Sequence, residues 1–225
     1  NQMKLVNSLI AAAFVFSMAT AQAGVIIGGT RIIYHADKKE SSLDVKNPDP
    51  YSYLIQSWVD KDENDTSKTP FIVTPPLFRL AGNEENKLRI INTGGNLPQD
   101  RESLFWMNIK TIPATEKLDN VNTLQIAIKT RIKLIYRPAS LTEMPEKFAS
   151  KLSWKRSDQQ LTVSNPTPYY MNFSEVKVGA STVTDATYFA PMSSATFSLP
   201  ANAKGNIRWK IISDFGAAGA EHQTQ

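Results

Sequence analysis

The segment VNTLQIAIKTRIKLIYRP, residues 121–138, has the clearest periodicity in the chain. Its large apolar side chains share one parity and its polar side chains share the other: Leu124, Ile126, Ile128, Ile132, Leu134 and Tyr136 against Gln125, Lys129, Arg131, Lys133 and Arg137. Such alternation predicts a β-strand, and this one exceeds the usual length of about five or six residues. A long strand with an apolar row promotes aggregation unless something pairs with it. Either the fold hides this edge or the chain lends it to a partner, and we expect the second.

The rest of the chain is strand-like, with short apolar or alternating runs between turn clusters, as is typical of β-sandwiches. Tyr51–Val59 has bulky residues on both faces and predicts a central strand. Leu104–Ile112 is expected to form a hairpin with residues 121–138. Thr74-Pro75-Pro76 ends a strand and permits a cis X-Pro bond. Residues 216–225 are polar and small, which predicts a frayed end.

The first 23 residues have the pattern of a secretory signal peptide. Lys4 gives a positive start, Leu5–Ala19 is mostly apolar, and Ala21-Gln22-Ala23 is a small-x-small cleavage site. The apolar run is shorter than the roughly 20 residues that a membrane-spanning helix needs. We expect cleavage before Gly24, and therefore export.

Composition limits how the exported chain holds together. The 225 residues include no cysteine, so disulfides cannot supplement the core. About 200 mature residues suffice for one large or two small domains. The formal charge is +4, and removal of Lys4 leaves 24 − 21 = +3, a mildly basic surface that does not by itself call for nucleic acid.

The residues supply little material for catalysis or metal binding. His35 and His222 are the only histidines, and no glycine pair precedes a helix as in a phosphate-binding loop. Residues 60–71 fail as a calcium loop, because Asp65 takes the glycine position and Phe71 the position of the bidentate glutamate. Paired carboxylates such as Glu84-Glu85 are ordinary surface features. We expect no catalytic residues, no metal, no cofactor and no nucleic-acid partner.

Several motifs together resemble the periplasmic pilus-assembly chaperones of the PapD/FimC-like type, and the likeness spans nearly all of the mature chain in the right order. The matching segments are Thr74-Pro75-Pro76 with Arg79-Leu80, Leu97–Trp106, Leu124–Ile128, Arg131–Pro138 and Val163–Tyr170. The short loop before the long strand resembles the short-loop subclass. The absence of cysteine departs from relatives that carry a disulfide in the second domain.

The resemblance implies an all-β fold of two immunoglobulin-like sandwiches set at an angle, with a cleft between them and no enzyme activity. The implied domains are residues 24–141, which contain the donor strand, and residues 145–225. Such chaperones bind pilus subunits whose own sandwich lacks its last strand, and they lend the long strand to complete it by donor-strand complementation. In this chain Leu124, Ile126 and Ile128 match the donated side chains.

The resemblance also implies two charged sites. Arg31 and Lys133 match the pair of cations that anchors the subunit's C-terminal carboxylate in the cleft. Lys133 has the opposite parity to Ile126, so on a regular strand it points away from the donated row. A buried interdomain charge network matches three further residues, Glu102, Arg137 and Asp214.

The partners implied are fimbrial subunits and an outer-membrane usher, and the compartment is the periplasm. Edge physics also favours self-association of the free chaperone through its donor strand. The alternative is an exported two-domain adhesin or carbohydrate-binding module of the immunoglobulin type. That class would need exposed aromatic side chains on a binding face instead of an apolar strand edge.

Overall fold

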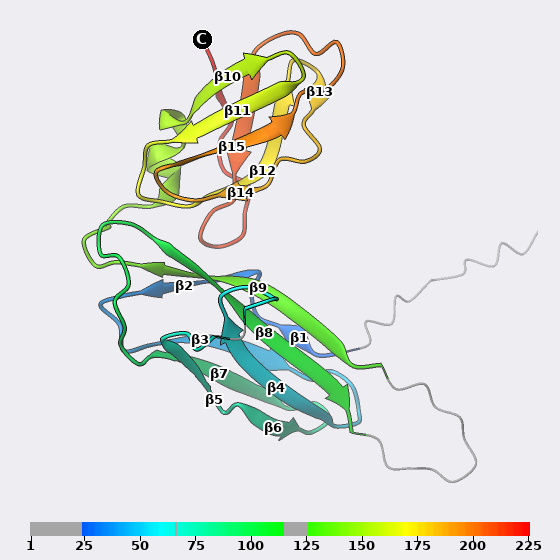
Figure 1. The fold of residues 1–225 in the computed structure, drawn as a ribbon. Helices are drawn as coiled ribbons and strands as arrows, with labels where there is room; N and C mark the ends of the chain where they lie inside the picture. The colour runs from blue at the N-terminus through cyan, green and yellow to red at the C-terminus, as the bar shows by residue number, and fades with distance from the viewer. Residues whose placement is uncertain (1–23, 66, 115–125) are drawn as a thin grey trace, which may run out of the picture.

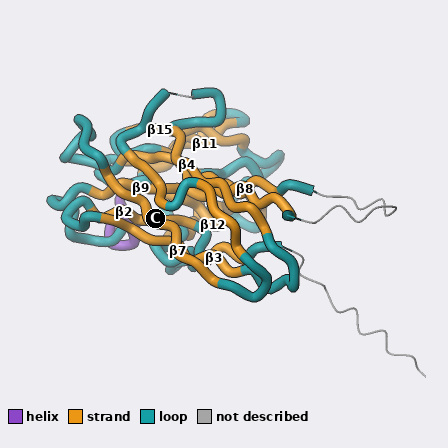
Figure 2. Tube along the Cα trace, turned by 90° about the horizontal axis from the view of Figure 1, so that it is seen from below, coloured by secondary structure: helices purple, strands orange, loops and turns teal. Residues whose placement is uncertain are grey.

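The computed structural model describes residues 24–65, 67–114 and 126–225, so the expected signal peptide and Leu124 lie outside the described residues. Strands dominate, and the single helical segment among the described residues is the short 3₁₀ helix η1 (Pro145–Lys151) (Figure 2). No helix in this part of the chain is long and apolar enough to cross a membrane. The strands form two β-sandwich units, each with its own core (Figure 1).

The N-terminal unit packs a four-stranded sheet on a five-stranded sheet. The first has the order β1-β3-β7-β5, with β1 (Ile26–Ile27), β3 (Glu40–Lys46), β7 (Glu85–Asn92) and β5 (Phe71–Thr74). The second has the order β2-β9-β8-β4-β6, with β2 (Arg31–His35), β9 (Ile128–Arg137), β8 (Ser103–Pro113), β4 (Tyr53–Asp60) and β6 (Leu77–Leu80).

Period-2 patterning explains how this unit forms its core. On β4, Tyr53, Ile55 and Ser57 are buried while Leu54 and Gln56 are exposed, as the alternation requires. The strand pairs with β6 on one side and β8 on the other, which confirms the predicted central position. The expected hairpin of β8 and β9 is also present. The Thr74–Pro75 bond between β5 and β6 is cis.

The chain changes sheets between β1 and β2, at Gly28-Gly29. The Gly28 amide donates to the carbonyl oxygen of Asp44 at 2.8 Å. A Cβ added at Gly28 would lie 3.0 Å from that oxygen, closer than side chains normally approach. Glycine therefore lets β1 finish against β3 while β2 crosses to the side of β9.

The C-terminal unit follows η1 and contains two further sheets. One has the order β10-β11-β15, with β10 (Ser153–Ser157), β11 (Gln160–Asn165) and β15 (Ser193–Ser198). The other has the order β13-β12-β16-β17, with β14 also paired to β12: β13 (Ser181–Thr182), β12 (Met171–Val178), β16 (Ile207–Ile211), β17 (His222–Gln223) and β14 (Tyr188–Phe189). Trp209 Nε1 donates to the Ala149 carbonyl at 2.9 Å and fixes η1 to this core.

The expectation that residues 216–225 are frayed was wrong. The tail turns back and adds β17 to the edge of β16, with Arg208 opposite Gln223 and Trp209 opposite His222. The Thr224 amide donates to the Ile207 carbonyl at 2.9 Å. The tail has no apolar alternation, so backbone pairing holds it, and such pairing leaves no signal in the sequence.

Candidate functional site: a free strand edge and an interdomain cleft

In the described part of the chain, strand β9 has two neighbouring strands along one half of its length and one along the other half. Its C-terminal half is internal, because β8 pairs with one side and β2 pairs with the other from Lys133 to Arg137. Its N-terminal half pairs only with β8 among the described residues, so one backbone edge is free there. Ile132 is buried in the core, whereas Ile128 and the preceding Ile126 are 50% and 59% exposed. The apolar row thus leaves the protein's own core and continues into solvent.

The two predicted cations lie side by side where β2 joins β9. The parallel register of these strands places Arg31 directly opposite Lys133. Neither side chain has a carboxylate within ion-pair distance among the described residues. The Nε of Arg31 is buried and has no hydrogen-bond partner there. A buried donor without an acceptor is costly, so this position favours an incoming anion.

Electrostatics supports the same interpretation. The pKa of Lys133 is lowered to about 8, mainly because the side chain is partly buried and secondly because the positive charge of Arg31 is close by. Burial also lowers the pKa of Arg31, and the nearby carboxylate of Asp214 opposes that effect. Two half-buried cations close together make each other's charged form less favourable. A negative group bound between them stabilises both charged forms.

The C-terminal unit meets the N-terminal unit beside Lys133. A hollow of about 670 Å³ between the units is lined by side chains of both, among them Trp106, Arg131, Tyr170 and Tyr188, but not by Arg31 or Lys133. Lys133 Nζ lies 4.1 Å from the centre of the Tyr188 ring, which packs edge-on against Trp106 at 6.0 Å between centroids. Lys133 also donates to Asn172 Oδ1 at 2.7 Å. No local pattern in the sequence marks Asn172, Tyr188 and Trp106 as members of this site, because they meet through contacts between separate units.

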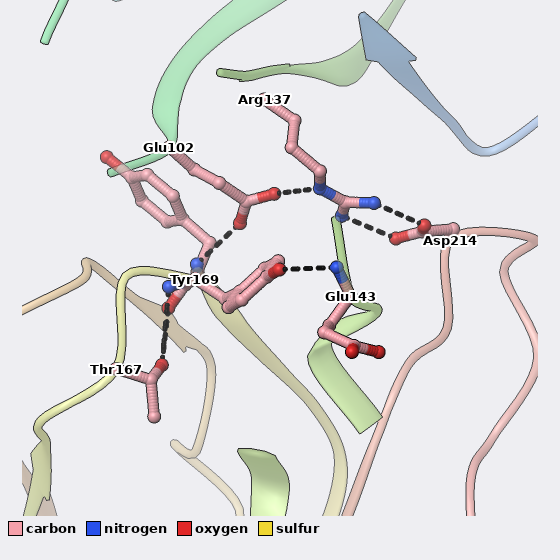
Figure 3. A network of polar contacts seen from close by, with 7 residues as sticks. Glu102, Arg137, Glu143, Thr167, Tyr169 and Asp214 are labelled. Carbon is pink, nitrogen blue, oxygen red and sulfur yellow. Dashed lines mark hydrogen bonds and ion pairs between the residues drawn. The ribbon is translucent and has the colours of Figure 1, made fainter. Parts of the chain in front are cut away.

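The three residues of the predicted charge network lie together between the units (Figure 3). Arg137 Nε donates to Glu102 Oε2 at 2.7 Å, and its two terminal nitrogens donate to the two oxygens of Asp214 at 2.7 and 2.8 Å. The other Glu102 oxygen accepts the backbone N–H of Tyr170 at 2.7 Å. Glu102 and Arg137 belong to the N-terminal unit and Asp214 and Tyr170 to the other, so the network joins both.

Burial makes this network sensitive to the loss of any member. The side chains of Arg137, Glu102 and Asp214 are 4%, 1% and 11% exposed. Burial raises the pKa of Glu102 to about 7, against the opposing effect of Arg137. Ion pairing and hydrogen bonds with Asp214 and Glu102 outweigh burial and raise the pKa of Arg137. Because a buried ion pair contributes little net stability, its main effect is geometric.

The segments rejected as metal or catalytic sites have simpler structural roles. Asp60 pairs with Arg131 at 3.0 Å, which holds the start of the polar loop that follows β4. His35 is exposed at the end of β2, and His222 stacks on Trp209 at 5.8 Å between ring centres. The described residues contain no group of three or more potential metal-ligating His, Cys, Asp or Glu side chains.

Two family models match the chain in succession. Residues 24–142 match the N-terminal domain of the PapD pili and flagellar-assembly chaperones. Residues 147–223 match the C-terminal domain of the PapD pili assembly chaperones. The two matches meet at the connection that leads into η1, between the two cores described above.

Individual relatives agree with the family models. The chain is 49% identical to the chaperone protein FimC of Escherichia coli K12 over 200 residues, which is 88% of this chain and 82% of that protein. It is 44% identical to the E. coli chaperone protein FocC over 206 residues, 90% of each.

Solved structures give the same result. A structure of the SafA pilin in complex with the SafB chaperone from Salmonella enterica contains a chain that matches with a TM-score of 0.83 and 39% identity, covering 89% of this chain and 95% of that one. The E. coli chaperone DraB matches with a TM-score of 0.81 and 38% identity, covering 90% and 96%. The described chain therefore belongs to the PapD family of pilus-assembly chaperones, with the family's two immunoglobulin-like domains.

Proposed function

We propose that this protein captures fimbrial subunits in the periplasm by donor-strand complementation and delivers them to an outer-membrane usher for assembly. The subunit inserts the N-terminal part of β9 and the residues before it into its own incomplete sandwich. In this proposal the protein performs no catalysis and uses no cofactor, and a cleaved signal peptide at residues 1–23 exports it.

The observation that carries the proposal is the free edge of β9. Ile126 and Ile128 stand about half exposed beside unpaired backbone groups. Full burial of an aliphatic side chain is worth about 1.5–3 kcal/mol, so each of these side chains offers about half of that to a partner. Backbone pairing along the edge supplies the remaining affinity. Leu124 would extend the same row.

The second part of the proposal assigns Arg31 and Lys133 to the C-terminal carboxylate of the subunit. The unpartnered Nε of Arg31 and the absence of any carboxylate at Lys133 among the described residues support this assignment. Charge-assisted hydrogen bonds to a carboxylate are stronger than neutral ones. An anchored chain end fixes the register in which the subunit meets β9.

The third part of the proposal is that Glu102, Arg137 and Asp214 hold the two units at one angle. Their short contacts join a strand end of one unit to a loop and a backbone amide of the other. A fixed angle keeps the free edge and the cations at a constant distance. The structure of the SafA pilin in complex with the SafB chaperone, at 39% identity, is a related precedent for a chaperone with a bound subunit.

A capture experiment tests the proposal. Wild-type protein and the variant Ile126→Asp are expressed in the periplasm with a purification tag, and co-purified proteins are identified by mass spectrometry. A buried carboxylate without a partner is strongly unfavourable, so the variant should lose a small β-rich subunit while its melting temperature is unchanged. Ile72→Asp is the matched control, because Ile72 is 48% exposed on β5 of the other sheet.

The expected result is full capture by wild type and Ile72→Asp and no capture by Ile126→Asp. Equal capture by all three proteins contradicts strand donation. Arg31→Ala and Lys133→Ala test the anchor separately, and each should weaken capture without unfolding the protein. Full pilus assembly with both substitutions together contradicts the anchor.

A further inference from the structure

We propose that Asn172 of the C-terminal unit is a third member of the carboxylate site, which orients Lys133 and itself donates a hydrogen bond to the bound carboxylate. The inference rests on the proposed function and deepens it. Its consequence is that the anchor is built from both units, so that the site is complete only at one interdomain angle.

The contact with Lys133 determines how the amide of Asn172 is oriented. Lys133 Nζ donates to Asn172 Oδ1 at 2.7 Å. An ammonium group only donates, so the oxygen of the amide faces Lys133 and the NH₂ group lies on the other side. Among the described residues no acceptor hydrogen-bonds to that NH₂ group, and Lys133 uses one of its three donors. Both side chains therefore retain donors for the same acceptor.

The backbone holds Asn172 firmly in place. The residue is 5% exposed and lies on β12, where it pairs with Tyr188 of β14. Its carbonyl oxygen accepts the Ile212 amide at 2.7 Å. Among the described residues, the buried atoms without a partner do not include its Nδ2, so the NH₂ group is open to solvent. A fixed, nearly buried amide that keeps two unused donors open to solvent beside a cation is available to bind an incoming acceptor.

The chemistry of the three groups suits a chain-terminal carboxylate. Arg31 and Lys133 supply charge, and they already disfavour each other's protonated form. A third cation would increase that repulsion, whereas the neutral amide adds a donor without adding charge. A carboxylate has about four acceptor sites on two oxygens, which accommodate a guanidinium, an ammonium and an amide together.

The test uses a carboxylate probe and does not need the natural subunit. N-acetyl-glycylglycine with a free carboxylate is titrated into the wild-type protein while the ¹³Cε signal of Lys133 is followed by NMR. The same peptide with a C-terminal amide is the ligand control. Wild type should show a saturable shift and a rise in the pKa of Lys133 with the free acid only.

Substitutions at Asn172 then separate a binding role from a structural one. Asn172→Ala should weaken binding of the peptide about five- to tenfold. Asn172→Asp has nearly the same shape but forms an ion pair with Lys133, so it should raise the pKa of Lys133 and abolish binding. Asn86→Ala is the matched control, because Asn86 is exposed on β7, in the other sheet of the N-terminal unit.

Each result either supports or overturns the proposed role of Asn172. Peptide binding at wild-type strength by Asn172→Ala or Asn172→Asp, while Lys133→Ala loses it, overturns the role of Asn172 and leaves the two-cation anchor intact. If Asn172→Ala fails to fold, Asn172→Leu keeps a similar shape without a donor or a charge, and binding of the peptide at wild-type strength by this variant overturns the role of Asn172. A wild-type protein that does not respond to the free acid overturns the inference and the proposed anchor together, whereas strand donation is tested separately by Ile126→Asp.

Discussion

The protein manages two strand edges in opposite ways. In the C-terminal unit the edge of β16 is covered, because the tail adds β17 to it and places His222 on Trp209. In the N-terminal unit β9 has no second neighbour before Lys133 among the described residues, and Ile126 and Ile128 face solvent. Both edges carry the same hazard of unwanted pairing, yet one is closed by the chain's own end.

The difference shows that the exposure of β9 is not a general looseness of the fold. Only a few residues would suffice to cover a strand edge, as the two-residue strand β17 demonstrates. The free segment of β9 also lies next to the half-buried cations Arg31 and Lys133, whereas the two cations on β16, Arg208 and Lys210, are paired with Glu221 and Glu175. An edge left open beside a charged site is typical of a surface kept for a partner.

The largest expected effect comes from separating the two units that carry these edges. Arg137→Ala leaves Glu102 and Asp214 buried without their cation, which should lower the free energy of unfolding by about 3–5 kcal/mol. Urea unfolding measures this loss, and small-angle scattering should show a broader range of interdomain angles. Arg89→Ala is the control, because its ion pair with Glu40 is exposed and 4.0 Å long and should contribute well under 1 kcal/mol. Equal losses for the two variants would contradict a network that couples the units.

Removing the cover from β16 should convert the closed edge into an open one. Deletion of residues 221–225 removes β17, its backbone hydrogen bonds and the stacking on Trp209. The expected loss is about 2–3 kcal/mol of unfolding free energy, with faster hydrogen exchange at Ile207 and Trp209. His222→Ala keeps the backbone pairing and should lose less than half as much. Unchanged exchange after the deletion would show that the tail does not protect this edge.

The cations should give capture at the open edge a pH dependence that a plain apolar edge lacks. The pKa of Lys133 in the free protein is about 8, and a bound carboxylate raises it, because an opposite charge favours the protonated form. As the pH rises above 8, binding takes up a proton and affinity should fall by up to about tenfold per pH unit. Subunit binding measured from about pH 7.5 to 9.5, above the pKa of about 7 of Glu102, tests this, and Lys133→Arg should give a flat profile over that range. A wild-type profile as flat as that of Lys133→Arg contradicts the anchor.

Charging the open edge should have the smallest effect on folding and a clear effect on association. We expect Ile128→Lys to change the unfolding free energy by less than about 0.5 kcal/mol, because the side chain is already half exposed. Self-association of the free protein, followed by sedimentation at rising concentration, should decrease. Ile72→Lys on β5 is the control and should associate like wild type. Equal association of both variants would place the self-contact elsewhere.

Local patterns in the sequence predicted much of the fold and several positions of the site. Alternation predicted the central strand β4 and the hairpin of β8 and β9. Parity also predicted that Lys133 points away from the apolar row, and its side chain contacts Asn172 of the C-terminal unit. The resemblance to pilus chaperones assigned Glu102, Arg137 and Asp214 to one network, although no spacing rule connects them, and the three side chains are in contact. The roles of these side chains stay predictions.

The features that the sequence did not predict depend on contacts between distant segments. Asn172 is the second residue of β12 and comes just after an ordinary turn, so nothing nearby marks it as a partner of Lys133. The prediction that the tail is frayed was wrong for a related reason, since the pairing of the tail with β16 uses backbone groups that every residue has. Periodicity reports which face of an element is buried, but it does not report which separate element will cover it.

The parallel pairing of β2 with β9 has a consequence for the order of events during synthesis. Arg31 and Lys133 are neighbours in the sheet but stand 133 − 31 = 102 residues apart in the chain. A chain that emerges with its N-terminus first exposes β2 long before β9 exists, and contacts between such distant residues form slowly. The free segment of β9 is therefore among the last parts of its domain to appear, when the other strands of the N-terminal unit have already been synthesised.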